Sequence, residues 1–465
     1  MNKTIINLVL AVVLITASLP LVAQSEPPEG VAVTVPGLLV EANKAYLAKD
    51  YLAFRKAMEG LHRLRPYNGQ YMYQLVVAHA LLDEKDQAYG LMLRMQQQGL
   101  SYDFSKTDST DNIKDTEVFE YVNDLMVMAG EPVGETEPEF VLPASVLMPE
   151  TIAWDESRQK FLIGTVTEGS ILAVDGDGQV TELLRANKEN GLGAVLDVLV
   201  DQARNRLWVS SAALPAFSGF SPADKGRSAL FEFDLESLEL IRRYPVPDDA
   251  RPHILGSMVL SPNGDIFIVD RALPLIYKKP ADEQVLKAVL ASREMVSMRG
   301  IAMQPDGALM YVGDREMGIL IIDVKGGRVG KLKVPDTLNL GGIDGLYLWN
   351  NHLVVIQDGI NPQRVMRLEL DSTGTQVTMV RPLAVAQPDF DSPSYGTVRG
   401  EDLYFFANRQ ATDSEGRTNA VTVLQTPINS SKDLVVPDMR EYLDQRAKRL
   451  ENKYNDPEED QPETP

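Results

Sequence analysis

Cysteine is absent from this chain of 465 residues, and there are only 4 histidines. Without cysteine the chain can form neither a disulfide bond nor the lipid-modified cysteine that anchors a bacterial lipoprotein. The histidines are scattered, and no two have the i, i+4 spacing of a zinc-binding pair on a helix. Packing alone must therefore hold the fold together, and the histidines give no indication of a zinc site.

An excess of positive charge is also lacking. The chain has 45 Lys and Arg against 66 Asp and Glu, for a formal net charge of -21. Such a chain repels polyanions, so we expect neither nucleic acid nor an anionic membrane as a partner. Beyond the N-terminus no apolar run reaches the length of a transmembrane helix, and we expect no membrane span in the mature chain. A serine-hydrolase elbow and a glycine-rich phosphate loop are missing as well.

The N-terminus, by contrast, has the pattern of an export signal. Lys3 precedes an apolar stretch over residues 5–17, and Leu-Val-Ala at 21–23 is typical of a cleavage site. We interpret residues 1–23 as a signal peptide, with an uncleaved N-terminal anchor as the alternative, and expect a periplasmic or secreted protein. The proline-rich residues 24–36 read as a linker.

A helical pattern follows over residues 37–129. Apolar residues recur at i, i+3 and i+4 in two successive segments, each with a polar break at its centre. Two such hairpins resemble tetratricopeptide repeats, and residues 112–126 predict a short capping helix. Two interpretations stay open: a surface that docks a protein partner, or a helical cap packed on the next domain. Residues 130–142, rich in Glu, Pro and Gly, read as a second linker.

From residue 143 to 428 the pattern is that of strands, and it repeats. Each repeat has an alternating strand, a turn rich in Asp, Asn, Gly or Pro, and a second apolar strand. The repeats begin with ETIAWDE at 150, AVLDVLV at 194, GSMVLSP at 256, RGIAMQP at 299, IDGLYLW at 343 and YGTVRGE at 395. Six units of four strands predict a six-bladed β-propeller. The fold class is thus mainly β, a six-bladed β-propeller preceded by an α-helical domain.

Two further segments interrupt or follow the repeats. Residues 211–229 form an insertion in the second unit, and we expect a loop that covers one face of the propeller. Residues 429–454 predict an amphipathic C-terminal helix, and the acidic, proline-rich residues 455–465 predict a disordered tail.

The first repeat, LMPETIAWDESRQKFLIGTVTEGSILAVD, resembles the opening blade of the gluconolactonase/regucalcin (senescence marker protein) family. The segment from RNRLWVSSAAL to IRRYPVP is similar to the yellow/royal-jelly branch of such propellers. The resemblance covers about residues 145–428. It implies a hydrolase of sugar lactones or similar esters, with one divalent metal, such as calcium, zinc or manganese, at the mouth of the central channel.

The resemblance also implies a set of site residues. Glu150 and Asp344 match the metal-ligand positions and are the candidate metal ligands. Arg299 stands where the family has a ligand Asn, and Leu196 stands where it has a substrate-binding Asn, with Asp197 beside it. Asp197 and Arg299 are the candidate catalytic residues.

Arginine has no lone pair to offer a cation, so Arg299 conflicts with a metal at this position. A cation placed there can instead neutralise the crowded acids, and we predict that Glu150 lies within salt-bridge reach of Arg299, either directly or through a shared water. Two functions therefore stay open: a metal-dependent lactone or ester hydrolase, or a non-catalytic binding or scaffold protein. The second would hold a small polar molecule at the propeller mouth and a protein partner on its helices.

Overall fold

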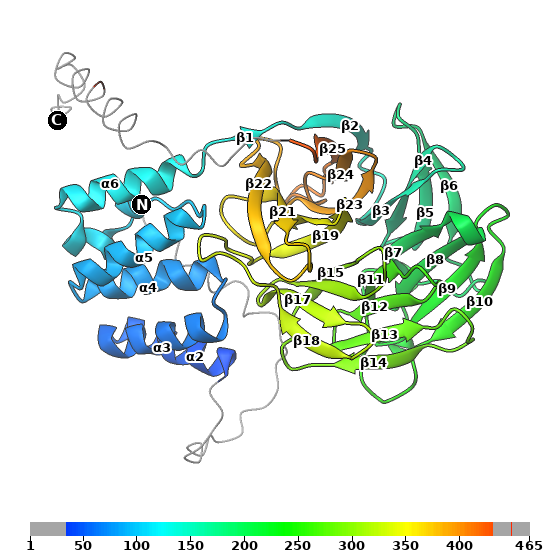
Figure 1. Ribbon diagram of the computed structural model, residues 1–465, viewed down its shortest axis with the longest axis horizontal. Helices are drawn as coiled ribbons and strands as arrows, with labels where there is room; N and C mark the ends of the chain where they lie inside the picture. Colours follow the sequence, from blue (N-terminus) through cyan, green and yellow to red (C-terminus); the bar gives the residue numbers. More distant parts are fainter. Residues whose placement is uncertain (1–33, 431–447, 449–465) are drawn as a thin grey trace.

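The computed structural model describes residues 34–430 and residue 448, and these form a group of helices beside a ring of six sheets (Figure 1). The predicted signal peptide lies outside the described residues, as do the tail and nearly all of the predicted C-terminal helix. In the described part of the chain, no helix combines the length and the apolar character needed to cross a membrane.

The helical part confirms the two predicted hairpins and the capping helix. Its elements are α2 (Val35–Leu47), α3 (Tyr51–Leu64), α4 (Gly69–Leu81), α5 (Lys85–Gln97), the 3-10 turns η1 (Phe104–Lys106) and η2 (Asp108–Ile113), and α6 (Glu117–Met128). The first helix begins inside the predicted linker. Thr34 caps it by accepting a hydrogen bond from the Gly37 N–H, and Pro36 lies in the first turn, where its missing N–H costs nothing.

The six predicted blades are present. Each is an antiparallel sheet whose strands follow chain order from the channel outwards, except that the fifth and sixth sheets have a strand from earlier in the chain at their outer edge. The first blade comprises β3 (Pro149–Asp155), β4 (Lys160–Thr165), β5 (Ser170–Val174) and β6 (Val180–Arg185), and the second comprises β7 (Ala194–Asp201), β8 (Arg206–Ala212), β9 (Ser228–Asp234) and β10 (Leu240–Pro245). The third comprises β11 (Leu255–Leu260), β12 (Ile266–Asp270), β13 (Leu275–Lys279) and β14 (Lys287–Ala291), and the fourth comprises β15 (Met298–Met303), β16 (Leu309–Asp314), β17 (Gly318–Asp323) and β18 (Arg328–Lys331). The fifth comprises β19 (Ile343–Trp349), β20 (His352–Gln357), β21 (Arg364–Leu370) and β22 (Val377–Val385), and the sixth contains β23 (Ser394–Arg399), β24 (Asp402–Phe406) and β25 (Val421–Pro427).

The predicted linker at 130–142 is wrong, because these residues supply two outer strands. β2 (Glu137–Leu142) pairs with β25 and completes the sixth blade, and β1 (Val133–Gly134) pairs with β22 of the fifth. Phe140 and Leu142 are buried whereas Val141 is exposed, as on a strand with one face towards solvent. An outermost strand tolerates the glutamates and proline that make the segment read as a linker.

The helices pack against loops at one end of the propeller. Arg65, which follows α3, forms an ion pair with Glu316 in the β16–β17 loop. Arg364, at the start of β21, donates a hydrogen bond to the Gln98 carbonyl after α5 at 3.0 Å. Ile360 of the β20–β21 loop packs into the apolar core of the helices. The helical part thus packs against, and supports, the face of the propeller on which the inner strands begin.

Candidate functional site

A cavity of about 440 Å³ opens at the mouth of the central channel, on the face where the six inner strands begin. Residues from the beginning and from the end of the propeller sequence, from Met148 to Gln410, meet there. Three of the four predicted site residues, Glu150, Arg299 and Asp344, line this cavity. The structure therefore brings together residues that lie up to 194 positions apart in the sequence.

A β-bulge near the start of each inner strand explains why these side chains converge. The pairing of each inner strand with the next strand shifts register at this level. A bulge leaves a residue outside the ladder and re-aims its side chain. Five of the residues passed over line the cavity, and we call them the bulge ring: Glu150, Leu196, Arg299, Asp344 and Tyr395.

Asp197 is the predicted site residue that does not line the cavity. It comes one position after the bulge residue Leu196 and is back in the ladder. Its carboxylate accepts hydrogen bonds from the Thr151 hydroxyl at 2.8 Å and the Met258 N–H at 2.7 Å. Burial raises its pKa to about 6. Asp197 thus ties three neighbouring blades together, and its position gives the predicted catalytic role no support.

Glu150 is paired with a cation, but not with the one predicted. Its carboxylate accepts a hydrogen bond from Arg271 Nη1 at 2.8 Å and one from the Tyr395 hydroxyl at 2.6 Å. The Arg271 guanidinium also lies over the Tyr395 ring, 5.5 Å from its centroid. The direct form of the predicted Arg299–Glu150 salt bridge is therefore wrong, because Arg271, which follows the second strand of the third blade, takes that place. Contact through a shared water stays a prediction.

Asp344 is the centre of a larger charge network. It accepts hydrogen bonds from Arg315 at 2.7 Å and from Arg409 at 3.2 Å. The same two arginines pair with Asp358, at 2.6 and 2.8 Å. Burial, together with the charge of Asp344, raises the pKa of Asp358. The two carboxylates are buried close together, and the arginines between them compensate the cost of that arrangement.

Arg299 is the arginine of this mouth with the fewest partners. Its Nε atom lies 3.5 Å from Asp344 Oδ1, and it donates no hydrogen bond to any residue that the structure describes. Burial, followed by the like charge of Arg271, lowers the pKa of the Arg299 guanidinium. It remains a cation at neutral pH, since even a perturbed arginine is not deprotonated. An anion bound beside Arg299 would offset both the cost of burying its charge and the repulsion from Arg271.

Sequence reasoning missed Arg271, Arg315 and Arg409, because they follow second strands rather than begin first ones. The signal for them is a repeated dipeptide at the end of the second strand: Asp270-Arg271, Asp314-Arg315 and Asn408-Arg409. In the first two the acid accepts hydrogen bonds from N–H groups of the following turn, including those of Ala272 and Glu316, both at 2.9 Å. The acid thus shapes the turn, and the arginine after it reaches the channel mouth.

The residues present do not fit a divalent metal. Such an ion takes six or more oxygen ligands as calcium, or at least three or four protein ligands as zinc. No group of three or more His, Asp or Glu in the described residues is placed to hold a metal. Glu150 and Asp344, the two predicted ligands, both accept hydrogen bonds from arginines. We therefore derive no chemistry through a metal.

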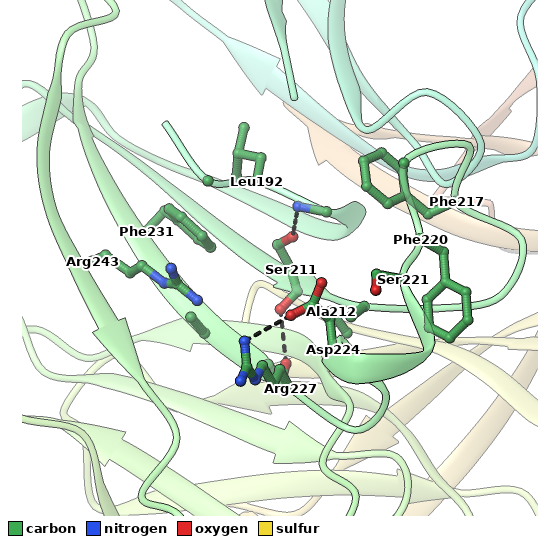
Figure 2. A pocket seen from close by; sticks show the side chains of 16 residues that line it. Leu192, Ser211, Ala212, Phe217, Phe220, Ser221, Asp224, Arg227, Phe231 and Arg243 are labelled. Atoms are coloured by element: carbon green, nitrogen blue, oxygen red, sulfur yellow. Dashed lines mark hydrogen bonds and ion pairs between the residues drawn. The ribbon is translucent and has the colours of Figure 1, made fainter. Parts of the chain in front are cut away.

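The predicted insertion is a loop over this face, between β8 and β9. Leu214 and Ala216 line the mouth cavity, and Phe217 and Phe220 line a second cavity of about 210 Å³ (Figure 2). The loop thus contributes side chains to both cavities.

The strand pairing and the mouth define the chain as a six-bladed β-propeller with an N-terminal helical part. No protein-family model and no curated protein matches the chain. Solved structures similar to it include a gluconolactonase from Xanthomonas campestris, at 16% identity and a TM-score of 0.43, covering 64% of this chain and 98% of that one. A virginiamycin B lyase from Staphylococcus aureus has 14% identity and a TM-score of 0.41, covering 65% of this chain and 90% of that one. An aldose sugar dehydrogenase from Streptomyces coelicolor has 12% identity and a TM-score of 0.42, covering 64% of this chain and 99% of that one. We take no activity from these similarities.

Proposed function

We propose that the protein binds a small organic anion at the propeller mouth and that Arg299 is the principal cation for it. The observation that carries this proposal is the incomplete pairing of Arg299 beside a cavity of about 440 Å³. A guanidinium presents five N–H donors in a planar fork that matches a carboxylate or phosphate. The Arg299 side chain is partly exposed to the cavity and has one ion pair, at 3.5 Å, so its N–H donors are available to an anionic ligand.

The other charges of the mouth support the same function. Arg271 and Arg409 also line the cavity, while Glu150 and Asp344 are already engaged with arginines. Counting the lining side chains gives three cations against two carboxylates. An anion therefore meets a net positive mouth in a protein whose overall charge is negative, which favours a selective small ligand over a polyanion.

Isothermal titration calorimetry with the full chain and hexanoate, a simple organic acid, tests the proposal. A hydrogen bond to a charged group contributes about 1.5–3 kcal/mol, so Arg299→Gln should weaken binding by roughly 10- to 150-fold. Arg328→Gln is the matched control, because that arginine lies on the outer strand β18 and is largely exposed. If no organic acid binds, or if Arg299→Gln binds as tightly as the wild type, the proposal is wrong.

The lactone or ester hydrolase implied by the sequence resemblance is the competing function. It requires a metal that polarises the carbonyl and activates water. Glu150 and Asp344 would have to exchange their arginine partners for that metal. Turnover of a lactone that depends on added calcium, zinc or manganese, and that Glu150→Gln abolishes, would establish the hydrolase in place of the binding protein.

We also propose that the helices bind a protein partner and that the protein is exported. Val40 and Leu47 are exposed on α2 and lie seven residues apart, on one side of the helix. A partner that is retained by the wild type and lost by the double variant Val40→Ser, Leu47→Ser would support docking at the helices. Fractionation of cells that produce the full chain tests export, with a shortened chain outside the cytoplasm as the expected result.

A further inference from the structure

We propose that the anion bound at the mouth has an apolar body rather than a polyhydroxylated one. This inference rests on the proposed function and names the class of ligand. It follows from how the lining of the cavity is divided. One side of the cavity is charged and the other is apolar, and the apolar side consists of Val166, Leu196, Leu214, Ala216 and Ile254.

The apolar residues come from the first three blades, and the first and third of these also supply Glu150 and Arg271, which are paired with each other. The charged residues Arg299, Asp344 and Arg409 come from the other three blades. Leu196 is the bulge residue of the second blade, and in a ring of six the second blade faces the fifth, which carries Asp344. Arg299 and Arg409 belong to the fourth and sixth blades, on either side of Asp344. A ligand whose acid group meets these arginines therefore extends towards Leu196.

The apolar side is a packed wall. Val166, Leu196 and Ala212 form one buried cluster, against which Leu214 and Ile254 pack. The uncharged polar residues of the cavity, Ser394, Tyr395, Asn408 and Gln410, all come from the sixth blade and so belong to the charged side. The hydroxyl groups of a sugar acid would lose water at this wall and find no side-chain partner there.

The insertion keeps this wall in place before any ligand arrives. The Ala213 N–H donates to the Arg227 carbonyl at 2.9 Å, which closes the base of the loop, and the Ser218 N–H donates to the Thr167 carbonyl at 2.8 Å. Asp224 and Arg227 form an ion pair at 2.7 Å within the loop (Figure 2). A wall held by such contacts loses little conformational freedom on binding, which favours affinity for a matching apolar group.

Hexanoate and gluconate are a matched pair of probes, because both are six-carbon carboxylates and they differ in hydroxyl groups. In calorimetric titrations of the full chain we expect hexanoate to bind at least tenfold more tightly than gluconate or acetate. Leu214→Asn should reduce the affinity for hexanoate several-fold and leave that for acetate unchanged. Leu240→Asn, on the outer strand β10, is the control and should bind hexanoate as the wild type does.

The possible results separate this inference from the function on which it rests. Gluconate that binds as tightly as hexanoate, and still requires Arg299, would overturn the apolar ligand and leave the anion site standing. Unchanged hexanoate binding by Leu214→Asn would overturn the role of the wall in the same way. If none of the three acids binds, the proposed function itself is wrong.

Discussion

Replacing Arg364 by methionine should separate the helices from the propeller. Arg364 is buried at the start of β21 and has no carboxylate among its hydrogen-bond partners. Its guanidinium donates to Gln357 Oε1 at 2.8 Å, to the Asn339 carbonyl at 2.9 Å and to the Gln98 carbonyl at 3.0 Å. The last of these carbonyls belongs to the C-terminal end of α5, where a cation is favourable.

Two opposing effects set the magnitude. Three hydrogen bonds to a charged group contribute about 1.5–3 kcal/mol each, so their loss costs roughly 5–9 kcal/mol. Burial lowers the pKa of Arg364 to about 10, and at about 1.4 kcal/mol per pKa unit removal of the charge returns about 3 kcal/mol. The loss exceeds the gain, and we expect Arg364→Met to destabilise the folded chain by about 2–6 kcal/mol. Only the bond to the Gln98 carbonyl crosses to the helices, and its loss weakens their docking by about 1.5–3 kcal/mol.

Urea unfolding followed by two probes measures this effect. Trp154, Trp208 and Trp349 all lie in the propeller, so their fluorescence reports the blades, whereas circular dichroism at 222 nm reports the helices. In Arg364→Met both transitions should move to lower urea, by up to a few molar at a slope of about 1–3 kcal/mol per molar, because two of the lost bonds lie within the propeller. The dichroism transition should move further than the fluorescence transition, because the helices also lose their bond to Arg364. Arg328→Met, at an exposed ion pair, is the control. If the dichroism midpoint of Arg364→Met equals that of the wild type, the docking argument is refuted.

Three further predictions follow from the site and the ring. Arg299→Asn should give no calcium, manganese or zinc binding in calorimetry, because Arg271, Arg315 and Arg409 still hold the two carboxylates; tight binding would restore the metal site. Asp197 has a folded-state pKa of about 6, so the native state holds its proton more firmly than the unfolded chain does, and its contribution falls by about 3 kcal/mol as pH rises from about 4 to 6. Asp197→Asn should therefore gain stability relative to the wild type over that window, and a difference that does not vary with pH would contradict the buried carboxyl. Phe140→Ala should lower the free energy of unfolding by about 3–5 kcal/mol, because Phe140 is buried in β2 against Phe161. Val141→Ala, on the exposed face of the same strand, should have little effect, and equal effects of the two would argue against an integral outer strand.

The blades could be predicted from the sequence because each repeat carries its own local signal. An alternating strand, a turn and a second strand recur six times, and no long-range information is needed to count them. The closing strand was missed for a physical reason. β2 lies outermost on the sixth blade, and its partner β25 is almost three hundred residues away, so its composition follows its exposure rather than its pairing.

The position of the site was predictable in part, and the β-bulges limit what the sequence pattern can reveal about which side chains face the channel. Glu150, Arg299 and Asp344 stand at the heads of repeats and line the mouth as expected, whereas the metal-binding and catalytic roles assigned to them stay predictions. Asp197 was placed one residue too far along, since a bulge changes which side chain faces the channel and alternation alone does not reveal a bulge. Arg271, the true partner of Glu150, comes from a different blade, and no spacing rule connects the two positions.

The helices and the mouth share the same loops, which gives the helical part a role in the site. In the β16–β17 loop, Arg315 holds Asp344 and Asp358, and the next residue, Glu316, pairs with Arg65 of the helical part. In the β20–β21 loop, Asp358 pairs with Arg409, which lines the mouth, and Ile360 packs into the core of the helices. Each loop therefore contacts the charge network of the propeller through one residue and the helical part through another. Docking of the helices fixes the backbone that carries Arg315 and Asp358, and these residues share the pairing of Asp344 and Arg409. Arg299 then has only its 3.5 Å ion pair with Asp344 among the described residues, which is the arrangement that the proposed anion site requires.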